Sequence, residues 1–305
     1  MSKNSLEKFE LHELMEKMRT NPVAINGVGG YFKCKSGDDL YYRVWESSNQ
    51  KRIVVAIHGM GAHSEYYVQV ADQLIEEGIS VYALDVKHHG LSTGRKGDFE
   101  DFEEVMEQIH EFITVIREEN KNIPIFMMGL SMGGMITVNY SVIYPEDIKG
   151  IILMSPGVSR NFKLKASDIA KLPLLVFVYL FAKGKPIINV SKRAAITSRN
   201  PIRLEYQEND KYRIRKQSIR FLLNMAKWLK RAFNNAQNIS HPTLIMQGTD
   251  DKLISPEGVK EFFQNVPIED KTFVELQGAY HSLYSDPAMT EQDGWKKLVN
   301  WINSH

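Results

Sequence analysis

The sequence predicts an α/β fold in which a mainly parallel, eight-stranded sheet is flanked by helices and interrupted by one inserted helical cap. Three observations lead to this prediction. Eight short apolar runs are spaced along the chain, helix-periodic stretches separate most of them, and the alternation breaks only once, between positions 155 and 241. A chain of 305 residues is long enough for one such sheet domain with an insertion.

The predicted strands are short, and their composition indicates where each lies in the sheet. The first two read as an antiparallel hairpin that turns at residues 36–39, where Ser, Gly and Asp favour a turn. The strands from the third onward are more continuously apolar, as expected for strands that are buried on both faces. The predicted strands are residues 30–35, 40–45, 52–57, 80–84, 124–128, 150–154, 243–246 and 272–276.

Helical stretches connect the buried strands and give the βαβ alternation of a parallel sheet. They are predicted at residues 66–77, 102–119, 132–143, 256–264 and 295–302. A further short amphipathic helix is predicted near the N-terminus from the apolar positions Leu6, Phe9, Leu14 and Met18. Residues 1–29 are therefore assigned to an N-terminal helical extension.

A strongly basic segment fills the break in the alternation. Residues 157–240 contain 18 Lys and Arg but only four Asp and Glu, although the whole chain has a formal net charge of +1. The rest of the chain is correspondingly acidic, so a basic block is set into an acidic body. We therefore expect an α/β core formed by residues 30–156 and 241–305, with residues 157–240 as a basic helical cap.

Composition and segment lengths exclude several other classes of protein. Hydrophobic residues at 43% and charged residues at 25% are typical of a globular chain. The single cysteine, Cys34, excludes an intramolecular disulfide or a multi-cysteine zinc site. The first 20 residues lack the apolar segment of a signal peptide, and the longest apolar run, residues 172–182, is shorter than the roughly 20 residues that span a bilayer. We therefore expect a cytoplasmic protein that is not an integral membrane protein.

A candidate nucleophile lies between the fifth predicted strand and the helix that follows it. The apolar residues 125–128 lead into the sequence Gly-Leu-Ser-Met-Gly at residues 129–133, which is a G-x-S-x-G pattern. A nucleophile on a tight turn leaves little room for neighbouring side chains, which is why glycines flank it. Ser131 would also stand at a helix N-terminus, where free N–H groups favour developing negative charge.

A base and its orienting acid follow at the ends of later strands. Residues 243–246 lead into the acidic pair Asp250 and Asp251, and the last strand leads into His281. Spacing alone leaves both aspartates open as the acid. The order Ser, Asp, His, with each residue after a strand, is the order found in an α/β-hydrolase.

Backbone amides that could stabilise an oxyanion come from an earlier loop and from the serine turn. The third strand runs into residues 58–64, a glycine-containing loop. We assign the oxyanion hole to the backbone N–H groups of Met60 and Met132, the residue after the nucleophile. His58 and His63 in this loop are expected to be structural and to hydrogen-bond the backbone, not to titrate in catalysis.

These motifs resemble the α/β-hydrolases of the monoacylglycerol lipase and lysophospholipase group, which includes serine aminopeptidase-like members. The group's H-G-x-G-x-H-S, G-x-S-x-G-G and G-x-x-D motifs correspond to residues 58–64, 129–134 and 248–251, followed by His281. The resemblance implies Ser131 as nucleophile, His281 as general base and Asp251 as its orienter, and it implies no metal or organic cofactor. One departure is His88, which stands where the group's D-x-x-G-H-G-x-S loop has glycine.

The predicted function is therefore a serine hydrolase that cleaves carboxylic esters of lipid-like substrates such as monoacylglycerols or lysophospholipids. Short-chain carboxylesterase, amidase and aminopeptidase activities are alternatives, and a non-catalytic binding protein is a third class. No recognised nucleic-acid motif accompanies the basic charge, so no nucleic-acid partner is expected.

Substrate choice would depend on the cap. Its apolar stretch at residues 172–181 reads equally well as a helix packed over the active site and as a surface that dips into an anionic membrane. Residues 214–233 form a second amphipathic stretch with a basic face. We therefore hypothesise that the cap favours esters presented on anionic surfaces or substrates that carry a phosphate.

Overall fold

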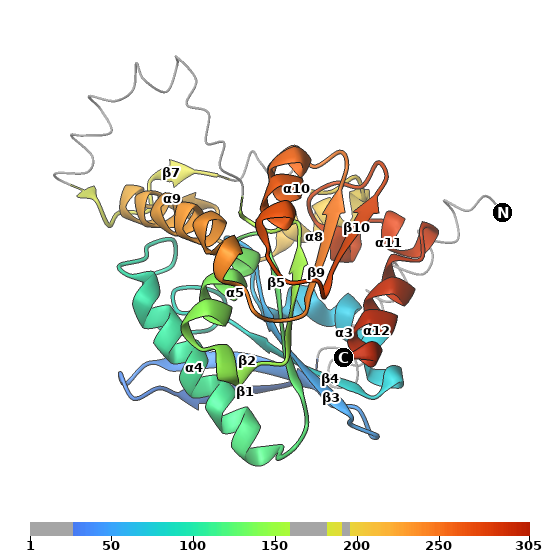
Figure 1. The fold of residues 1–305 in the computed structure, drawn as a ribbon. Coiled ribbons are helices and arrows are strands. Elements are labelled where there is room, and N and C mark those ends of the chain that lie inside the picture. The colour runs from blue at the N-terminus through green and yellow to red at the C-terminus, as the bar shows by residue number, and fades with distance from the viewer. Residues whose placement is uncertain (1–26, 159–181, 191–195) are drawn as a thin grey trace.

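The computed structural model describes residues 27–158, 182–190 and 196–305. The helix predicted around residues 6–18 and the apolar stretch predicted at residues 172–181 lie outside the described residues. Figure 1 shows a central sheet with helices on both faces, and the second half of the cap above one end of the sheet. None of the helices in the described part of the chain is both long and apolar enough to cross a bilayer.

The eight predicted strands form one sheet in the order β1-β2-β4-β3-β5-β6-β9-β10. The β1–β2 and β2–β4 pairs are antiparallel, and all later pairs are parallel. The prediction of a mainly parallel eight-stranded sheet is therefore confirmed, and each strand begins and ends within two residues of its expected bounds. The strands are β1 (Val28–Lys33), β2 (Asp39–Trp45), β3 (Arg52–Ile57), β4 (Ile79–Leu84), β5 (Ile125–Leu130), β6 (Gly150–Met154), β9 (Thr243–Gly248) and β10 (Lys271–Leu276).

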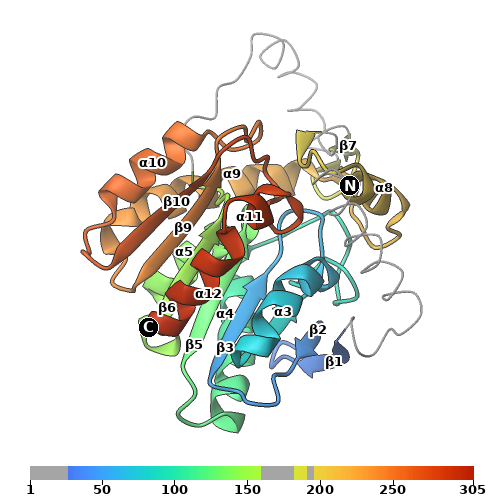
Figure 2. The same ribbon diagram turned by 90° about the vertical axis from the view of Figure 1, so that its right-hand side faces the viewer.

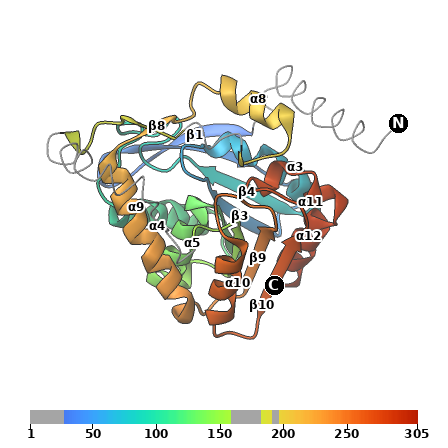
Figure 3. The same ribbon diagram turned by 90° about the horizontal axis from the view of Figure 1, so that it is seen from above.

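Two layers of helices bury the two faces of this sheet. One face is covered by α4 (Phe102–Glu119), α5 (Met132–Ile143) and α10 (Pro256–Asn265), and the other by α3 (Val68–Leu74), α11 (Ala288–Glu291) and α12 (Gly294–Ser304). Figure 3 shows these layers from above, on either side of the strands. Because both faces are covered, the central strands can be apolar at every position, and β4, β5 and β6 are buried throughout.

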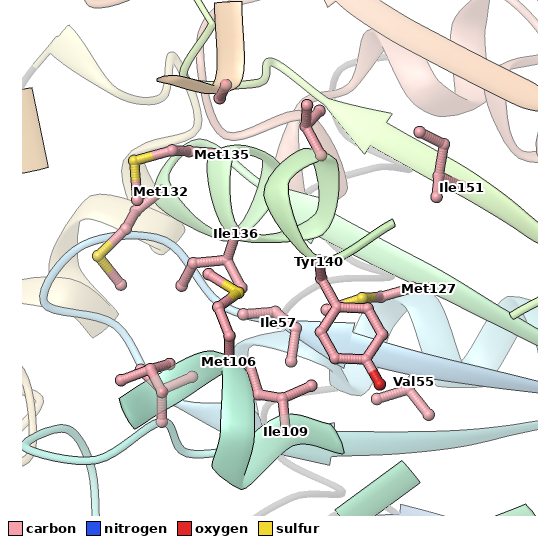
Figure 4. Packing of buried hydrophobic residues seen from close by; sticks show 14 of the residues in the cluster. Val55, Ile57, Met106, Ile109, Met127, Met132, Met135, Ile136, Tyr140 and Ile151 are labelled. Atoms are coloured by element: carbon pink, nitrogen blue, oxygen red, sulfur yellow. The ribbon is translucent and has the colours of Figure 1, made fainter. Parts of the chain in front are cut away.

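The core beneath the serine turn is rich in flexible methionine side chains. Met106 on α4 and Met132 and Met135 on α5 pack with Ile57 and Met127 of the sheet (Figure 4). Unbranched methionines fill irregular gaps between helix and sheet surfaces. The Met132 side chain is thus buried in the core, and only its backbone is available at the serine turn.

The predicted helix at residues 66–77 is divided into three short pieces. A 3-10 turn η1 (Ser64–Tyr67) leads into α3, and a second 3-10 turn η2 (Ile75–Glu77) ends at Gly78, whose φ is 80°. The first piece continues from the loop after β3, and buries Tyr66 and Tyr67. Tight turns of this kind are common at helix ends, where the periodicity of a sequence does not distinguish them from α-helix.

The described part of the cap contains two helices and a small sheet. These elements are β7 (Ile188–Asn189), α8 (Pro201–Asn209), β8 (Lys216–Gln217) and α9 (Ile219–Asn234). The amphipathic stretch predicted at residues 214–233 corresponds largely to α9, which packs its apolar side on α5. Figure 2 shows α8 and β7 above the sheet at the side of α3. The cap boundaries at residues 157 and 240 stay a prediction.

Candidate active site

Ser131 lies on a strained turn between β5 and α5. Its φ of 56° and ψ of −114° are uncommon for a residue with a side chain. The Ser131 N–H donates to the Met154 carbonyl oxygen at 3.1 Å, and its carbonyl accepts from the Gly157 N–H at 2.8 Å. These bonds to the end of β6 fix the turn and leave the half-buried hydroxyl at the C-terminal edge of the sheet, as in a nucleophile elbow.

The two glycines that flank Ser131 are required by close approach of the backbone. A Cβ atom at position 133 would lie 1.9 Å from the Ile57 carbonyl oxygen, and one at position 129 would lie 2.2 Å from the Gly133 carbonyl oxygen. Both distances are far below any van der Waals contact. Helix α5 can therefore start directly against the end of β3 only because these positions carry no side chain.

His281 and Asp251 form a buried pair at the ends of the last two strands. His281 Nδ1 lies 2.8 Å from Asp251 Oδ2, and both side chains are almost fully buried. The two residues come from the loops after the adjacent parallel strands β9 and β10, whose carboxyl ends lie side by side. Asp250, by contrast, is exposed, so the structure brings Asp251 and not its neighbour to the histidine.

The Asp251 carboxylate is fully engaged by donors. Oδ1 accepts from the Leu253 and Ile254 N–H groups at 2.8 and 3.0 Å, and Oδ2 accepts from the Gln247 amide at 3.2 Å as well as contacting His281. Burial alone would raise the pKa of Asp251, but the His281 charge and these hydrogen bonds outweigh it and lower the pKa. Asp251 therefore stays ionised and fixes the orientation of the His281 ring.

The loop after β3 lies directly against the serine turn. A Cβ atom at Gly59 would be 3.5 Å from both the Leu130 carbonyl oxygen and Ser131 Cβ. The next residue along the loop is Met60. Met132 is the first residue of α5, where backbone N–H groups have no partner within the helix. The two backbone amides assigned from the sequence thus belong to the two segments that adjoin Ser131.

His58 is held as a neutral structural residue. Its Nε2 accepts from the Val86 N–H at 3.1 Å, so the proton sits on Nδ1, which lies 2.8 Å from the Gly59 carbonyl oxygen. Complete burial lowers the pKa of His58 to about 4. Both ring nitrogens bond the backbone, as expected from the sequence.

His63 differs from the sequence-based expectation in its partner. Its Nε2 lies 2.9 Å from the carboxylate of Asp210 in the cap, so the expected backbone partner is replaced by a buried side chain. The Tyr66 hydroxyl donates to the same Asp210 oxygen at 2.6 Å. Burial would raise the pKa of Asp210, but these two partners and the Tyr212 N–H lower it to about 2. The Asp210 carboxylate therefore links the cap to the loop that carries Met60.

Asp85 fixes the same loop from the other side, a role that the sequence prediction missed. Its carboxylate accepts from the Ser64 N–H at 2.5 Å and from the Leu91 N–H at 2.8 Å. Within the segment that Asp85 holds, His88 has a φ of 70°, a conformation that favours glycine and so agrees with the glycine at this position of the D-x-x-G-H-G-x-S motif. The centres of the His88 and Phe99 rings lie 5.2 Å apart, and this aromatic contact offsets part of the strain of the left-handed backbone at His88.

Helix α9 brings an apolar surface close to Ser131. A Cβ atom at Gly157 would lie 2.8 Å from Leu229 Cδ2 and 3.0 Å from the Ser131 carbonyl oxygen. Met225 and Leu222, one and two turns before Leu229 on α9, are also only partly buried. The cap therefore offers a continuous hydrophobic strip that begins beside the serine.

The site contains no arrangement that resembles a metal centre in the described part of the chain. Among residues 27–158, 182–190 and 196–305, no group of three or more His, Cys, Asp or Glu side chains is placed to hold a metal ion.

The strand order, the strained serine turn and the buried His–Asp pair define an α/β-hydrolase. More particularly, the chain belongs to the serine aminopeptidase S33 family, whose sequence pattern matches residues 48–288.

Named relatives cover most of the chain. Phospholipase YtpA of Bacillus subtilis is 27% identical over 248 residues, which are 80% of this chain and 92% of that protein. The monoglyceride lipase of Rattus norvegicus is 26% identical over 275 residues, 88% of each chain. The crystal structure of Paleococcus ferrophilus monoacylglycerol lipase superposes with a TM-score of 0.74 at 29% identity, covering 87% of this chain and 99% of the other.

These similarities confirm three predictions from the sequence. The α/β-hydrolase fold, the resemblance to the monoacylglycerol lipase and lysophospholipase group, and the assignment as a carboxylic ester hydrolase all agree with the family and its members.

Proposed function

We propose that the protein is a serine hydrolase that cleaves carboxylic esters of lipid-like substrates, either monoacylglycerols or lysophospholipids, through an acyl-enzyme on Ser131. The observation that carries this proposal is the buried hydrogen bond of 2.8 Å between His281 and Asp251 at the sheet edge where the strained Ser131 turn also lies. A histidine whose orientation is fixed by a buried carboxylate is the arrangement that activates a serine hydroxyl.

Each side chain has a defined part in the first step. Asp251 occupies Nδ1 of His281 and keeps that nitrogen protonated, so Nε2 is the ring nitrogen that takes the Ser131 proton. The Ser131 oxygen then attacks the ester carbonyl carbon and forms a tetrahedral intermediate. The imidazolium formed on His281 is stabilised by the ionised Asp251.

The negative charge on the intermediate would be held by backbone amides. The Met60 and Met132 N–H groups are assigned this role because their segments adjoin Ser131 on two sides. Preorganised amides stabilise an oxyanion without reorganisation at the moment of reaction. When the intermediate collapses, the ester C–O bond breaks, the His281 imidazolium donates its proton to the leaving alcohol oxygen, and the acyl group stays on Ser131. Water then attacks the acyl group, gives its proton to His281 and releases the acid.

A lipid substrate is supported by the apolar strip on the cap and by the related proteins. Leu222, Met225 and Leu229 lead away from Ser131 on a partly buried face of α9 that can accommodate an acyl chain. The relatives are named a phospholipase and monoglyceride lipases. A peptidase would need a carboxylate for a substrate amino group, whereas Asp210, the buried acid of the described cap, is already bound by His63 and Tyr66.

We also propose that the cap contacts anionic membranes peripherally. Leu223 on α9 and Ile187 beside β7 are about half exposed, at 53% and 50%. Lys183, Lys185 and Lys227 are charged neighbours of these apolar side chains in the sequence. Exposed apolar side chains among lysines are typical of a surface that touches anionic lipid headgroups.

The proposed function is tested by initial rates on a panel of substrates with Ser131→Ala as the blank. The panel contains 1-oleoylglycerol, an oleoyl lysophospholipid, p-nitrophenyl acetate and leucine p-nitroanilide. The proposal expects serine-dependent turnover of the long-chain lipids. Turnover of only the acetate would indicate a short-chain esterase, turnover of only the anilide an aminopeptidase, and no serine-dependent turnover a binding protein.

A further inference from the structure

A buried arginine in the cap has no carboxylate partner among the described residues. Arg203 on α8 is 8% exposed, and its Cζ lies 3.8 Å from the centre of the Tyr66 ring, with Tyr206 and Tyr284 at 5.3 and 5.2 Å. Its Nη2 donates to the Tyr284 hydroxyl at 3.3 Å, whereas its Nε has no hydrogen-bond partner. Within the residues that the structure describes, no Asp or Glu forms an ion pair with Arg203.

The buried carboxylates nearby are already used by other groups. Asp210 is bound by His63 and Tyr66, and Glu65 is bound by Arg43 at 3.1 Å and by the Tyr206 hydroxyl. The two other acids of this part of the cap, at positions 205 and 208, are exposed. Within the described part of the chain, the acids near Arg203 are therefore either bound by other groups or exposed, and none neutralises it.

Two more arginines increase the positive charge around Arg203. Arg213 is half-buried and donates to the Gln207 carbonyl oxygen at 3.3 Å. Arg215 donates to the backbone carbonyl oxygens of Glu208 and Asp210 at 2.6 and 3.0 Å. Burial lowers the pKa of Arg213, and the charges of Arg203 and Arg215 lower it further. Among the described residues, neither Arg213 nor Arg215 has a carboxylate partner.

A bound anion would stabilise these closely spaced guanidinium groups. A guanidinium taken out of water loses hydration free energy, and like charges beside it add to that cost. Cation–π attraction to the tyrosine rings offsets part of this lost hydration free energy, but it leaves the Nε donor of Arg203 without a hydrogen bond. Two neighbouring guanidinium groups are suited to a phosphate group, which accepts several parallel N–H hydrogen bonds.

The cluster lies between two loops of the active site. Tyr66 follows the loop that carries Met60, and Tyr284 lies three residues after His281. Ile214, next to Arg213, donates its N–H to the Gly61 carbonyl oxygen at 3.0 Å, which places Arg213 at the edge of that loop. The cluster therefore adjoins the oxyanion loop, and it is separate from the α9 strip that begins at Leu229.

We propose that Arg203 and Arg213 bind a phosphate group, and that in the reaction this phosphate belongs to the headgroup of a lysophospholipid substrate. This inference rests on the proposed function and sharpens it, because it selects phosphate-bearing esters over neutral monoacylglycerols. The acyl chain would lie along α9 while the headgroup lies at the arginines, on the other side of Ser131.

The test compares two esters that differ only in the phosphate, 1-oleoylglycerol and 1-oleoylglycerol 3-phosphate, in micelles of a nonionic detergent. We expect the wild type to favour the phosphate-bearing ester. In Arg213→Gln, the ratio of kcat/KM for the phosphate ester to that for the neutral ester should fall by about 10- to 100-fold, mainly through KM, since a lost charged hydrogen bond has this effect on binding.

Two further variants separate a phosphate site from a general effect of cap charge. Lys230→Gln removes one positive charge from an exposed position on α9 and should leave the ratio unchanged. Arg213→Lys keeps the charge but not the planar fork, so it should recover part of the ratio. An equal fall in Lys230→Gln, or an unchanged ratio in Arg213→Gln, would overturn the proposal.

A binding measurement keeps this test independent of catalysis. We expect sn-glycerol 3-phosphate to raise the Tm of the wild type, glycerol to leave it unchanged, and Arg213→Gln to lose the shift. An equal shift with inorganic phosphate, together with an unchanged kinetic ratio, would assign the site to free phosphate and not to a headgroup. If the wild type hydrolyses neither ester but binds glycerol 3-phosphate through Arg213, the proposed function fails while the phosphate site stands.

Discussion

The His281–Asp251 pair and the arginine cluster of the cap lie near the same sheet edge, but their charges are balanced in opposite ways. Asp251 accepts four hydrogen bonds from the protein itself, including the one to His281. Arg203 has tyrosine faces, one hydrogen bond and no described carboxylate. The catalytic residue pair proposed in the core is thus fully paired within the protein, whereas Arg203 has no ionic partner among the described residues.

The two regions also differ in how the chain builds them. Asp251 and His281 follow neighbouring parallel strands, so the sheet brings them together. The cap cluster combines Tyr66, Arg203, Arg213 and Tyr284, which come from three separate segments of the chain. Positions in the core are therefore fixed by the fold, and positions in the cap depend on how the insertion docks.

The largest effect expected in the core is the loss of its nucleophile. Ser131→Ala should lower kcat for lipid esters by about 10⁴-fold or more, because the acyl-enzyme cannot form. The serine hydroxyl has no described structural partner, so the urea midpoint of unfolding should stay near that of the wild type. Steady-state rates and a urea titration on the same preparation measure both.

A matched pair of substitutions tests whether Asp251 orients His281. Asp251→Asn should reduce kcat by about 10²- to 10⁴-fold, since an amide no longer holds the ring in the required tautomer or stabilises its charge. Asp250→Asn removes the neighbouring carboxylate, which is exposed, and should change kcat less than about twofold. Equal losses in the two variants would contradict the assignment.

The packing of the serine turn predicts a large change in stability. In Gly133→Ala the new methyl group would collide with the Ile57 carbonyl oxygen, so the free energy of unfolding should fall by more than about 2 kcal/mol. Gly37→Ala is the control, because its φ of 92° is unfavourable for alanine but nothing lies within 4 Å. It should cost only about 1 kcal/mol, measured by urea unfolding.

The link between cap and core should depend on pH. The pKa of Asp210 falls from 3.8 unfolded to about 2 folded, so its contribution is present above the unfolded pKa and is lost as pH falls toward the folded value. Asp210→Asn should therefore lower the free energy of unfolding by about 2 kcal/mol at pH 7. The difference from wild type should shrink below about pH 4. A difference that stays constant down to pH 2 would exclude this linkage.

The smallest expected effect concerns the membrane surface of the cap. Lys227→Gln should weaken binding to vesicles that contain anionic lipid by about fivefold, since one lysine near such a surface contributes about 1 kcal/mol. Leu223→Ser should weaken binding to neutral and anionic vesicles alike, because it removes apolar contact. Co-sedimentation at two salt concentrations distinguishes these effects. Vesicle binding that is independent of salt would remove the electrostatic part of the proposal.

The sequence predicts the core well because its pattern is local. Apolar runs mark the strands, and residues 129–133 carry the turn chemistry of the elbow within five positions. What spacing could not decide was the choice between Asp250 and Asp251, which depends on which side chain turns toward His281. The predicted helix at 66–77 proved to be three pieces because the periodicity of a sequence does not distinguish 3-10 turns from α-helix.

Residues that act through distant partners could not be found in this way. Asp85 and Asp210 hold the loop after β3 through contacts with Ser64 and His63, and the partners of each pair come from separate segments of the chain. The basic composition of residues 157–240 indicated an anionic partner, but not which arginines have no carboxylate partner among the described residues. This can be decided only from the structure, which shows that the nearby acids Asp210 and Glu65 are bound by other side chains.

Covalent labelling of the nucleophile tests the central claim most directly. The protein is treated with a fluorophosphonate probe, and the modified residue is identified by mass spectrometry. The account predicts one probe per chain on Ser131, fast labelling that slows strongly in His281→Ala, and none in Ser131→Ala. Labelling at another residue, or no labelling of a folded wild-type protein, would contradict it.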